Sequence, residues 1–215
     1  LHYPLRRQRQ MCIRDRLKAV TAENRIFTDE PMKKHTTFRV GGPADILVQP
    51  KGTELAAVIR LCRKYDVPYQ VIGNGSNLLV GDRGIRGLVI EMLSKEDEIC
   101  VEDDCITVGA GMLLSKTANR AADHGLTGME FAAGIPGRIG GAVVMNAGAY
   151  GGEMKDILTA VTVLDQEGNE KILSAEELEL GYRTSCILKK GYIVTGAKIL
   201  SLIHISEPTR QEAIS

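Results

Sequence analysis

Two glycine-rich stretches constrain the fold of this chain more than any other part of its sequence. Residues 73–77 read GNGSN, and residues 134–153 read GIPGRIGGAVVMNAGAYGGE. Glycine has no Cβ atom, so it reaches left-handed backbone conformations and lets a ligand or a second backbone approach closely. We therefore expect both stretches to bring backbone, with few intervening side chains, against a flat or phosphate-bearing molecule.

Composition indicates an ordinary globular protein, and its balanced charges create no strong long-range electrostatic field. Hydrophobic residues make up 44% of the 215 residues, and 27 basic residues balance 27 acidic ones. A balanced charge gives no support for a nucleic-acid partner, and no apolar run is long enough to span a bilayer. Five scattered cysteines suit reduced thiols better than a disulfide framework. The expectation is a cytoplasmic monomer that binds neither nucleic acid nor membrane.

The spacing of apolar residues predicts an α+β fold with more strand than helix. Strands are expected over residues 38–40, 46–48, 67–72, 78–80, 88–90, 99–101, 106–108, 160–165, 171–173 and 192–200. Helices are expected after Thr53, over residues 111–124, and in a short segment that ends at Leu180. The short segment begins with a capping box formed by Ser174 and Glu177.

The two ends of the chain lack the pattern of the rest. Residues 1–16 are rich in arginine and show no helical or strand period, and residues 201–215 fit no expected element. We interpret both as non-native or disordered segments. A basic RNA-binding arm is the alternative for the first.

The GNGSN stretch has the chemistry of an anion site. Successive backbone N–H groups in such a turn form a concave nest suited to a diphosphate, and a plain glycine turn is the alternative. A Rossmann loop is a weaker alternative, because that motif needs Gly or Ala where Leu78 stands and must open a crossover helix. Glu91 follows a strand, where the ribose-binding acid of a Rossmann fold would stand.

Polar residues near the second stretch suggest ligand contacts. Asn146 offers an amide that could read a flavin or nucleotide edge, and Tyr150 brings a ring and a hydroxyl group. Arg183, in the segment GYRTS, suits a carboxylate or a phosphate. A buried glycine-rich crossing between strands is the alternative for the second stretch. His35 and His124 have no partner pattern, so we interpret them as structural.

Four segments, in this order and spacing, resemble the UDP-N-acetylenolpyruvoylglucosamine reductase (MurB) family. They are FRVGGPAD at residues 38–45, GNGSNLLV at 73–80, the second glycine stretch, and GYRTS at 181–185. The resemblance covers roughly residues 17–200. It implies a two-subdomain FAD-binding module of the vanillyl-alcohol-oxidase (PCMH) type, which is not a Rossmann fold. The first subdomain would then span residues 17–95 and the second residues 96–200.

The resemblance also implies roles for individual residues. Arg183 would be catalytic, stabilising the enolate that forms beside the substrate carboxylate, and Tyr150 and Tyr182 would contact the substrate. The cofactor-binding residues would be Gly73, Asn74, Gly75, Ser76, Asn77, Gly134, Ile135, Pro136, Gly137, Gly140, Gly141 and Asn146.

The implied reaction uses FAD as cofactor and NADPH as reductant. It reduces UDP-N-acetylglucosamine enolpyruvate to UDP-N-acetylmuramate, a peptidoglycan precursor. The family's proton-donating serine, in a GS-x-FKNP-like segment, and its late glutamate have no counterpart in this sequence. Ser201, Ser206, Glu207 and Glu212 lack the flanking residues. The expectation is a truncated chain without its substrate domain and without full activity; the alternatives are a non-catalytic flavin-binding module and a Rossmann-type NAD enzyme.

Overall fold

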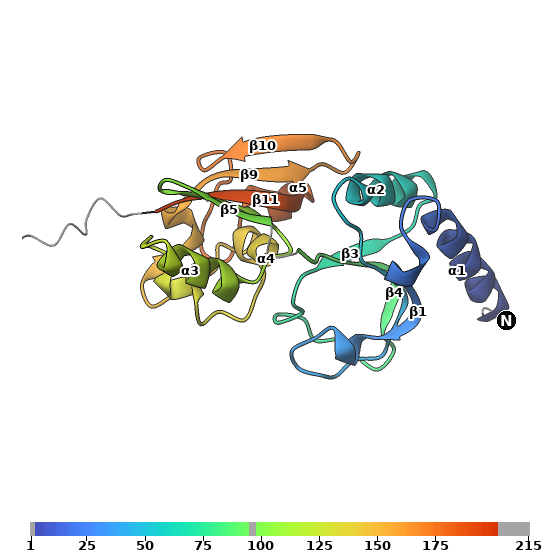
Figure 1. Ribbon diagram of the computed structural model, residues 1–215. Helices are drawn as coiled ribbons and strands as arrows, with labels where there is room; N and C mark the ends of the chain where they lie inside the picture. Colours follow the sequence, from blue (N-terminus) through green and yellow to red (C-terminus); the bar gives the residue numbers. More distant parts are fainter. Residues whose placement is uncertain (1–2, 95–97, 202–215) are drawn as a thin grey trace, which may run out of the picture.

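The structure, a computed structural model, describes residues 3–94 and 98–201 and contains two main sheets (Figure 1). In Figure 1 the segments from α1 to β4 lie on the right, and those from β5 to β11 lie on the left. Arg60 of the first part donates a hydrogen bond of 2.8 Å to the Gly168 carbonyl oxygen of the second. Leu164 and Ile193 of the second part are buried in a core cluster of the first. The two parts therefore pack directly on one another.

The first sheet combines one antiparallel and two parallel pairings. Its strands, in the spatial order β1-β2-β4-β3, are β1 (Ile26–Pro31), β2 (Pro43–Val48), β4 (Ile85–Glu91) and β3 (Tyr69–Ile72). β1 is antiparallel to β2, whereas β4 runs parallel to both β2 and β3. Parallel neighbours need a crossover connection of about a dozen residues. Between β3 and β4 residues 73–84 supply it without a helix, so the GNGSN loop emerges at the carboxyl end of β3.

Helix α2 (Glu54–Lys64) covers the first sheet, as its apolar spacing predicts. Its buried side chains recur at helical intervals: Leu55, Val58, Ile59, Leu61 and Cys62. Thr53 stands at the N-cap position, but its side chain makes no capping hydrogen bond. The predicted helix is therefore confirmed, and the capping contact does not form.

Helix α1 (Tyr3–Leu17) corrects the expectation that the N-terminal segment has no regular structure. Ile13 and Leu17 are one helical turn apart, and both are buried in the core cluster that also holds residues of α2 and β2. Arg16 lies 4.0 Å from the centre of the Tyr65 ring. Two apolar residues on one face are enough to dock a helix that is otherwise polar. That the segment is non-native stays a prediction.

Two short apolar triplets predicted as strands are loops instead. Phe38, Val40 and Leu79 are all exposed, whereas Val80 is buried in a core cluster with residues of the first sheet although it belongs to no strand. Arg39 adopts a left-handed conformation with φ of 55°, which is incompatible with a strand. Residues 175–180 form turns and no helix, although Ser174 and Glu177 do exchange the two hydrogen bonds of a capping box.

The second sheet is antiparallel throughout. In the spatial order β10-β9-β11-β6-β5, its strands are β10 (Glu170–Ser174), β9 (Leu158–Leu164), β11 (Ile193–Leu200), β6 (Cys105–Gly109) and β5 (Ile99–Glu102). The predicted hairpins β5-β6 and β9-β10 are confirmed. The remaining elements are α3 (Leu114–Asp123), α4 (Ile139–Val144), α5 (Cys186–Lys190), the pair β7 (Gly148–Ala149) and β8 (Gly152–Glu153), and 3₁₀ turns at Glu23–Arg25, Met32–Lys34, Glu130–Ala132 and Met154–Asp156.

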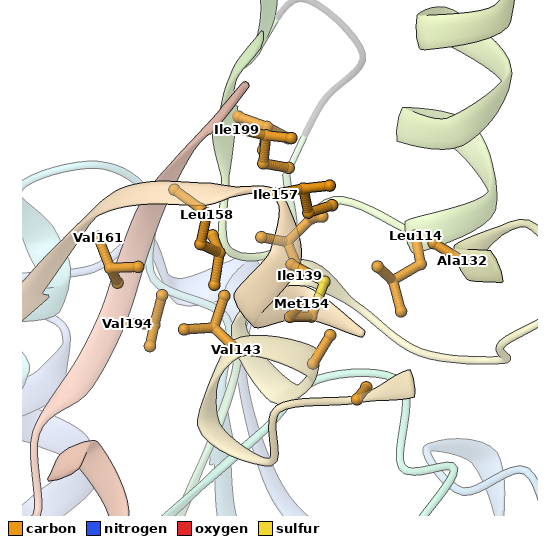
Figure 2. Packing of buried hydrophobic residues seen from close by; sticks show 14 of the residues in the cluster. Leu114, Ala132, Ile139, Val143, Met154, Ile157, Leu158, Val161, Val194 and Ile199 are labelled. Carbon is orange, nitrogen blue, oxygen red and sulfur yellow. The ribbon is translucent and has the colours of Figure 1, made fainter. Parts of the chain in front are cut away.

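Helix α4, which lies inside the second glycine stretch, packs on the core of the second sheet. Figure 2 shows Ile139 and Val143 of α4 gathered with Val161 of β9 and Val194 of β11 in one buried cluster. All four side chains are nearly or fully inaccessible to water. The glycine stretch is thereby fixed to a rigid platform. Within the described residues, no helix is both long enough and apolar enough to cross a bilayer.

A pair of substitutions tests the docking of α1. Leu17→Ala removes a fully buried side chain and should lower the free energy of unfolding by about 2–5 kcal/mol. Met11→Ala on the same helix removes a side chain that is 66% exposed, and should change it by less than about 0.5 kcal/mol. Urea unfolding followed by circular dichroism measures both. Equal effects of the two substitutions would show that α1 does not pack as described.

Candidate functional site

The two glycine-rich stretches line one cavity of about 650 Å³ between the two parts of the fold. The predicted site residues that line it are Gly73, Asn74, Gly75, Ser76, Asn77, Ile135, Pro136, Gly137, Gly141 and Arg183. The rest of the wall includes Arg138, Leu114, Met145 and Ala147, which are not among the individual residues predicted for the site. The structure therefore brings together most of a set that is spread over more than a hundred residues of sequence.

Close backbone contact fixes the shape of the GNGSN loop. Gly75 has φ of 59°, and a Cβ atom at this position would lie 2.1 Å from the His35 carbonyl oxygen. The Thr37 amide donates a hydrogen bond of 3.3 Å to the Gly75 carbonyl oxygen. Only glycine satisfies both the left-handed conformation and the lack of space. The loop therefore rests on the backbone of residues 35–37, with its opposite side toward the cavity.

Hydrogen bonds between His35 and buried or half-buried side chains hold residues 35–37 in place. His35 places its Nδ1 atom 3.0 Å from one Glu91 oxygen and its Nε2 atom 3.2 Å from a Glu30 oxygen. Gln49 donates a 2.7 Å hydrogen bond to the same Glu91 oxygen. His35 is thus structural, as the sequence predicts. Glu91 is 7% exposed and occupied by these partners, which removes it as a ribose-binding acid and weakens the Rossmann alternative further.

The second stretch packs at close range against the residue that follows β6. The Gly140 amide donates a 2.8 Å hydrogen bond to the Ala110 carbonyl oxygen, and a Cβ at Gly140 would lie 3.1 Å from the Ala110 Cβ. Gly140 lines a second, apolar cavity of about 480 Å³ that shares Ile72 and Gly73 with the first. Gly134 has open space around it and lines neither of these two cavities. The predicted cofactor role of Gly134 has no geometric support.

Arg138 is a charged residue of the loop cavity that lies inside the second glycine-rich stretch but is not among the individual residues predicted to bind the cofactor. Its Nη1 atom donates a short hydrogen bond to the Gly111 carbonyl oxygen. A Cβ at Gly73 would lie 3.2 Å from the Arg138 Cβ, so the arginine stem packs against the start of the GNGSN loop. Arginine inside a glycine-rich run gives no periodic signal, and its position became visible only with the fold.

Asn146 does not line the loop cavity but lines a smaller cavity of about 310 Å³ that borders Arg183, so its predicted contact with the cofactor stays a prediction. Its Nδ2 atom donates hydrogen bonds of 2.6 Å to Glu153 and 3.2 Å to the Gly181 carbonyl oxygen. Its Oδ1 atom accepts a 2.9 Å hydrogen bond from the Lys155 amide. Both amide protons are in use and the residue is 3% exposed. Asn146 ties the second glycine stretch to the Gly181 turn.

Tyr182 and Arg183 occupy the tip of a tight turn. Gly181 and Thr184 close it with backbone hydrogen bonds of 3.1 and 3.3 Å, and Arg183 is left-handed with φ of 55°. The next residue, Ser185, is fully buried and donates a 2.7 Å hydrogen bond to the Val144 carbonyl oxygen. Asn146 and Ser185 thus hold the turn from both ends. The Arg183 guanidinium is exposed and makes no hydrogen bond or ion pair with the described residues.

Tyr150 stands at a second tight turn beside Arg183. It joins β7 to β8 with Gly151, and the two residues have φ of 52° and 89°, as a two-residue hairpin turn requires. Tyr150, Tyr182 and Arg183 line a cavity of about 310 Å³. Both tyrosines are more than nine-tenths exposed. Arg183 borders this cavity and the loop cavity as well, so it stands between the two.

Comparison with known proteins places this arrangement in a family. A family model described as "FAD binding domain" matches residues 44–174 of the chain. The chain belongs to the FAD binding domain family. Its curated relatives bear the name UDP-N-acetylenolpyruvoylglucosamine reductase. A protein of that name from Clostridium tetani is 56% identical over 173 residues, covering 80% of this chain and 56% of the relative.

Solved structures agree on the fold. A crystal structure of UDP-N-acetylenolpyruvylglucosamine reductase (MurB) from Thermus caldophilus matches with a TM-score of 0.67 and 42% identity, over 79% of this chain and 59% of that one. A substrate-bound crystal structure of p-cresol methylhydroxylase matches with a TM-score of 0.65 and 15% identity, over 88% and 42%. The expected α+β module of the PCMH type is confirmed. The chain spans less than two thirds of the length of these relatives.

The observed cavity fits the cofactor that the family name implies. The GNGSN loop lines the space where a diphosphate would be held. At Gly75 the left-handed conformation and the lack of space favour glycine, so the loop presents backbone there. The wall beside it is mainly apolar, with Leu114, Ile135 and Met145, as a flat ring system requires. Arg138 adds a positive charge. These three features match the phosphate and ring portions of FAD.

The two glycines with contrasting surroundings allow a matched test. Gly75→Ala forces a Cβ into the His35 carbonyl oxygen at a left-handed residue, and should lower the free energy of unfolding by about 1–3 kcal/mol. Gly134→Ala has open space and no positive φ, so its unfolding curve should match that of the unaltered chain. Urea unfolding of both variants measures the difference. Indistinguishable curves would contradict the described loop.

Proposed function

We propose that this chain forms the FAD-binding part of an NADPH-dependent reductase. The reaction is reduction of UDP-N-acetylglucosamine enolpyruvate to UDP-N-acetylmuramate in peptidoglycan precursor synthesis. One observation carries the proposal: residues 73–77, residues 135–137 and Arg183 line the same cavity. The relatives that share this sequence pattern bear the name of that reductase. A cytoplasmic location and a monomeric state belong to the same proposal.

In this proposal each loop has a distinct task. Backbone N–H groups of residues 73–77 hold the diphosphate, because a nest of amides pointing into a cavity favours an anion. Residues 135–137 and Gly141 lie against the ring system, since they bring backbone and small groups to the cavity wall. FAD, once bound, supplies the hydride chemistry, and the protein supplies orientation and electrostatics.

Arg183 is the proposed catalytic residue. Reduction of an enolpyruvyl group places negative charge next to the substrate carboxylate, and a fixed cation lowers the energy of that charge. The Gly181 turn, held by Asn146 and Ser185, fixes the backbone of Arg183. Its guanidinium makes no ion pair within the described chain, so it is available to a substrate. Tyr150 and Tyr182 are proposed to contact the substrate across the smaller cavity.

A second candidate is a flavin-binding module that does not turn over the sugar nucleotide. It is favoured by one observation, namely that the family model matching residues 44–174 is described as an FAD binding domain, a description that names a cofactor and no substrate. Both candidates bind FAD, and only the first reduces a substrate with it. Arg183 has a function only in the first.

Titration with FAD tests the feature that both candidates share. The purified chain should quench the fluorescence of added FAD to a 1:1 end point, and the cofactor released on denaturation should be intact FAD. Gly75→Ala distorts the loop against His35 and should weaken this binding by about tenfold or more. A folded chain that does not bind FAD would contradict the proposed function.

Anaerobic reduction and reoxidation separate the two candidates. NADPH should bleach the bound flavin, and the enolpyruvyl substrate should then restore its visible absorbance. Arg183→Gln should leave FAD affinity unchanged and slow the restoration by about 100- to 1000-fold, the usual cost of losing one group that stabilises a developing anion. Arg120→Gln, on an exposed face of α3, should leave this rate unchanged. Bleaching without any restoration by substrate would favour the second candidate.

A further inference from the structure

Arg138 is a partly buried charged residue to which the proposed function assigns no task. The side chain is partly buried in the wall of the loop cavity. Its Nε atom is shielded from water and has no hydrogen-bond partner among the described residues. A buried N–H donor left unpaired costs free energy comparable to a lost hydrogen bond, and more when the group is charged. An arginine with this environment in a cavity wall is suited to an acceptor that the protein itself does not provide.

The guanidinium is held in place before any ligand arrives. Its Nη1 atom donates to the Gly111 carbonyl oxygen, and its stem packs against Gly73. These two contacts fix the plane of the group at the junction of β3, the GNGSN loop and α4. The remaining N–H donors keep the planar geometry that pairs with two oxygens of a phosphate or carboxylate.

Nearby charges leave the arginine without a direct counterion. Burial lowers the pKa of Arg138, and the negative charge of Glu91 opposes that effect. Glu91 itself is hydrogen-bonded to His35 and Gln49. Because it makes no ion pair with Arg138 within the described residues, Glu91 compensates the charge only from a distance. A doubly charged anion in the cavity would complete the compensation at contact range.

We propose that Arg138 pairs with the diphosphate of the bound cofactor, opposite the backbone of residues 73–77. The inference rests on the proposed FAD site and assigns a residue to it. Oxidised isoalloxazine is uncharged, so the diphosphate is the anionic part of FAD. Gly73, which the arginine stem touches, begins the loop proposed to hold that group, and Ser76 of the same loop lies on the Gly137 side of the cavity, 4.0 Å from the position of a Cβ at Gly137. Loop amides and guanidinium would thus approach the diphosphate from two sides.

The test compares three ligands by isothermal titration calorimetry on the full chain. FAD and ADP both carry a diphosphate, whereas riboflavin carries the ring system without phosphate. Arg138→Gln should weaken FAD and ADP binding by about 10- to 100-fold, the range expected for one charge-assisted contact, and leave riboflavin binding unchanged. The same variant should reduce the dependence of FAD affinity on salt concentration. Arg138→Lys, which keeps the charge but loses the planar fork, should lie between.

Controls separate this inference from the proposed function. Arg120→Gln removes the same charge from an exposed site and should change none of the affinities. If the unaltered chain binds no FAD, the proposed function fails and the inference fails with it. Two results with an unaltered chain that binds FAD overturn only the inference. Either Arg138→Gln weakens the binding of FAD and of riboflavin by the same factor, or it changes the binding of neither ligand.

Two further outcomes bear on the pairing. A fourth titration uses UDP: if Arg138→Gln abolishes UDP binding and leaves FAD binding intact, Arg138 serves the diphosphate of the sugar nucleotide and the inference is overturned. If Arg138→Gln does not fold by circular dichroism, Arg138→Lys decides the question. Weaker FAD and ADP binding with unchanged riboflavin binding in that variant supports the pairing, and equal changes for all three ligands contradict it.

Discussion

The two parts of this fold meet where Gly73 lies against the side chain of Arg138, and the site depends on that contact. Gly73 follows the last residue of β3, and Arg138 directly precedes α4, which packs on the second sheet. Their contact therefore joins the first sheet to an element of the second part. A side chain at residue 73 would have to push the arginine stem away. The contact therefore limits how closely the two glycine-rich stretches approach one another at this point of the cavity.

Most of the sheet structure could be predicted from the sequence, because buried strands carry dense apolar runs. Residues 46–48 of β2 and residues 88–90 of β4 are almost completely buried. The triplets at 38–40 and 78–80 have the same local composition but pair with no strand. Val80 is nevertheless buried in a core cluster with Leu47 and Val89. Pairing between distant segments decided these cases, and no local pattern reports it. Helix α1 was missed for a related reason: Ile13 and Leu17 dock it against a surface that exists only in the folded chain.

Site residues could be predicted where the backbone conformation requires a particular residue type. They could not be predicted where the role depends on which groups the side chain contacts. Gly75 had to be glycine, because its conformation and its distance from His35 exclude every other residue. The hydrogen bonds of Asn146 within the protein could not be predicted, because an amide looks the same in sequence whether it meets a ligand or the protein. Its three partners come from residues 153, 155 and 181, and only the folded chain reveals them. Arg138 was not predicted individually, because the interpretation of its segment rested on the surrounding glycines and not on the charged side chain.

The positions of Asn146 and Arg138 divide the site into two halves that are supported separately. Asn146 and Ser185 hold the turn that presents Arg183, and both act through the second glycine stretch and α4. The His35–Glu91 pair holds the loop of residues 73–77, and it acts through the first sheet. Arg138 precedes α4 as its N-cap residue and contacts the loop at Gly73, so it joins the two supports. A change in the first sheet can then reach Arg183 through Arg138, and also through the Asn77 side chain, which donates a hydrogen bond to the Met145 sulfur just after α4.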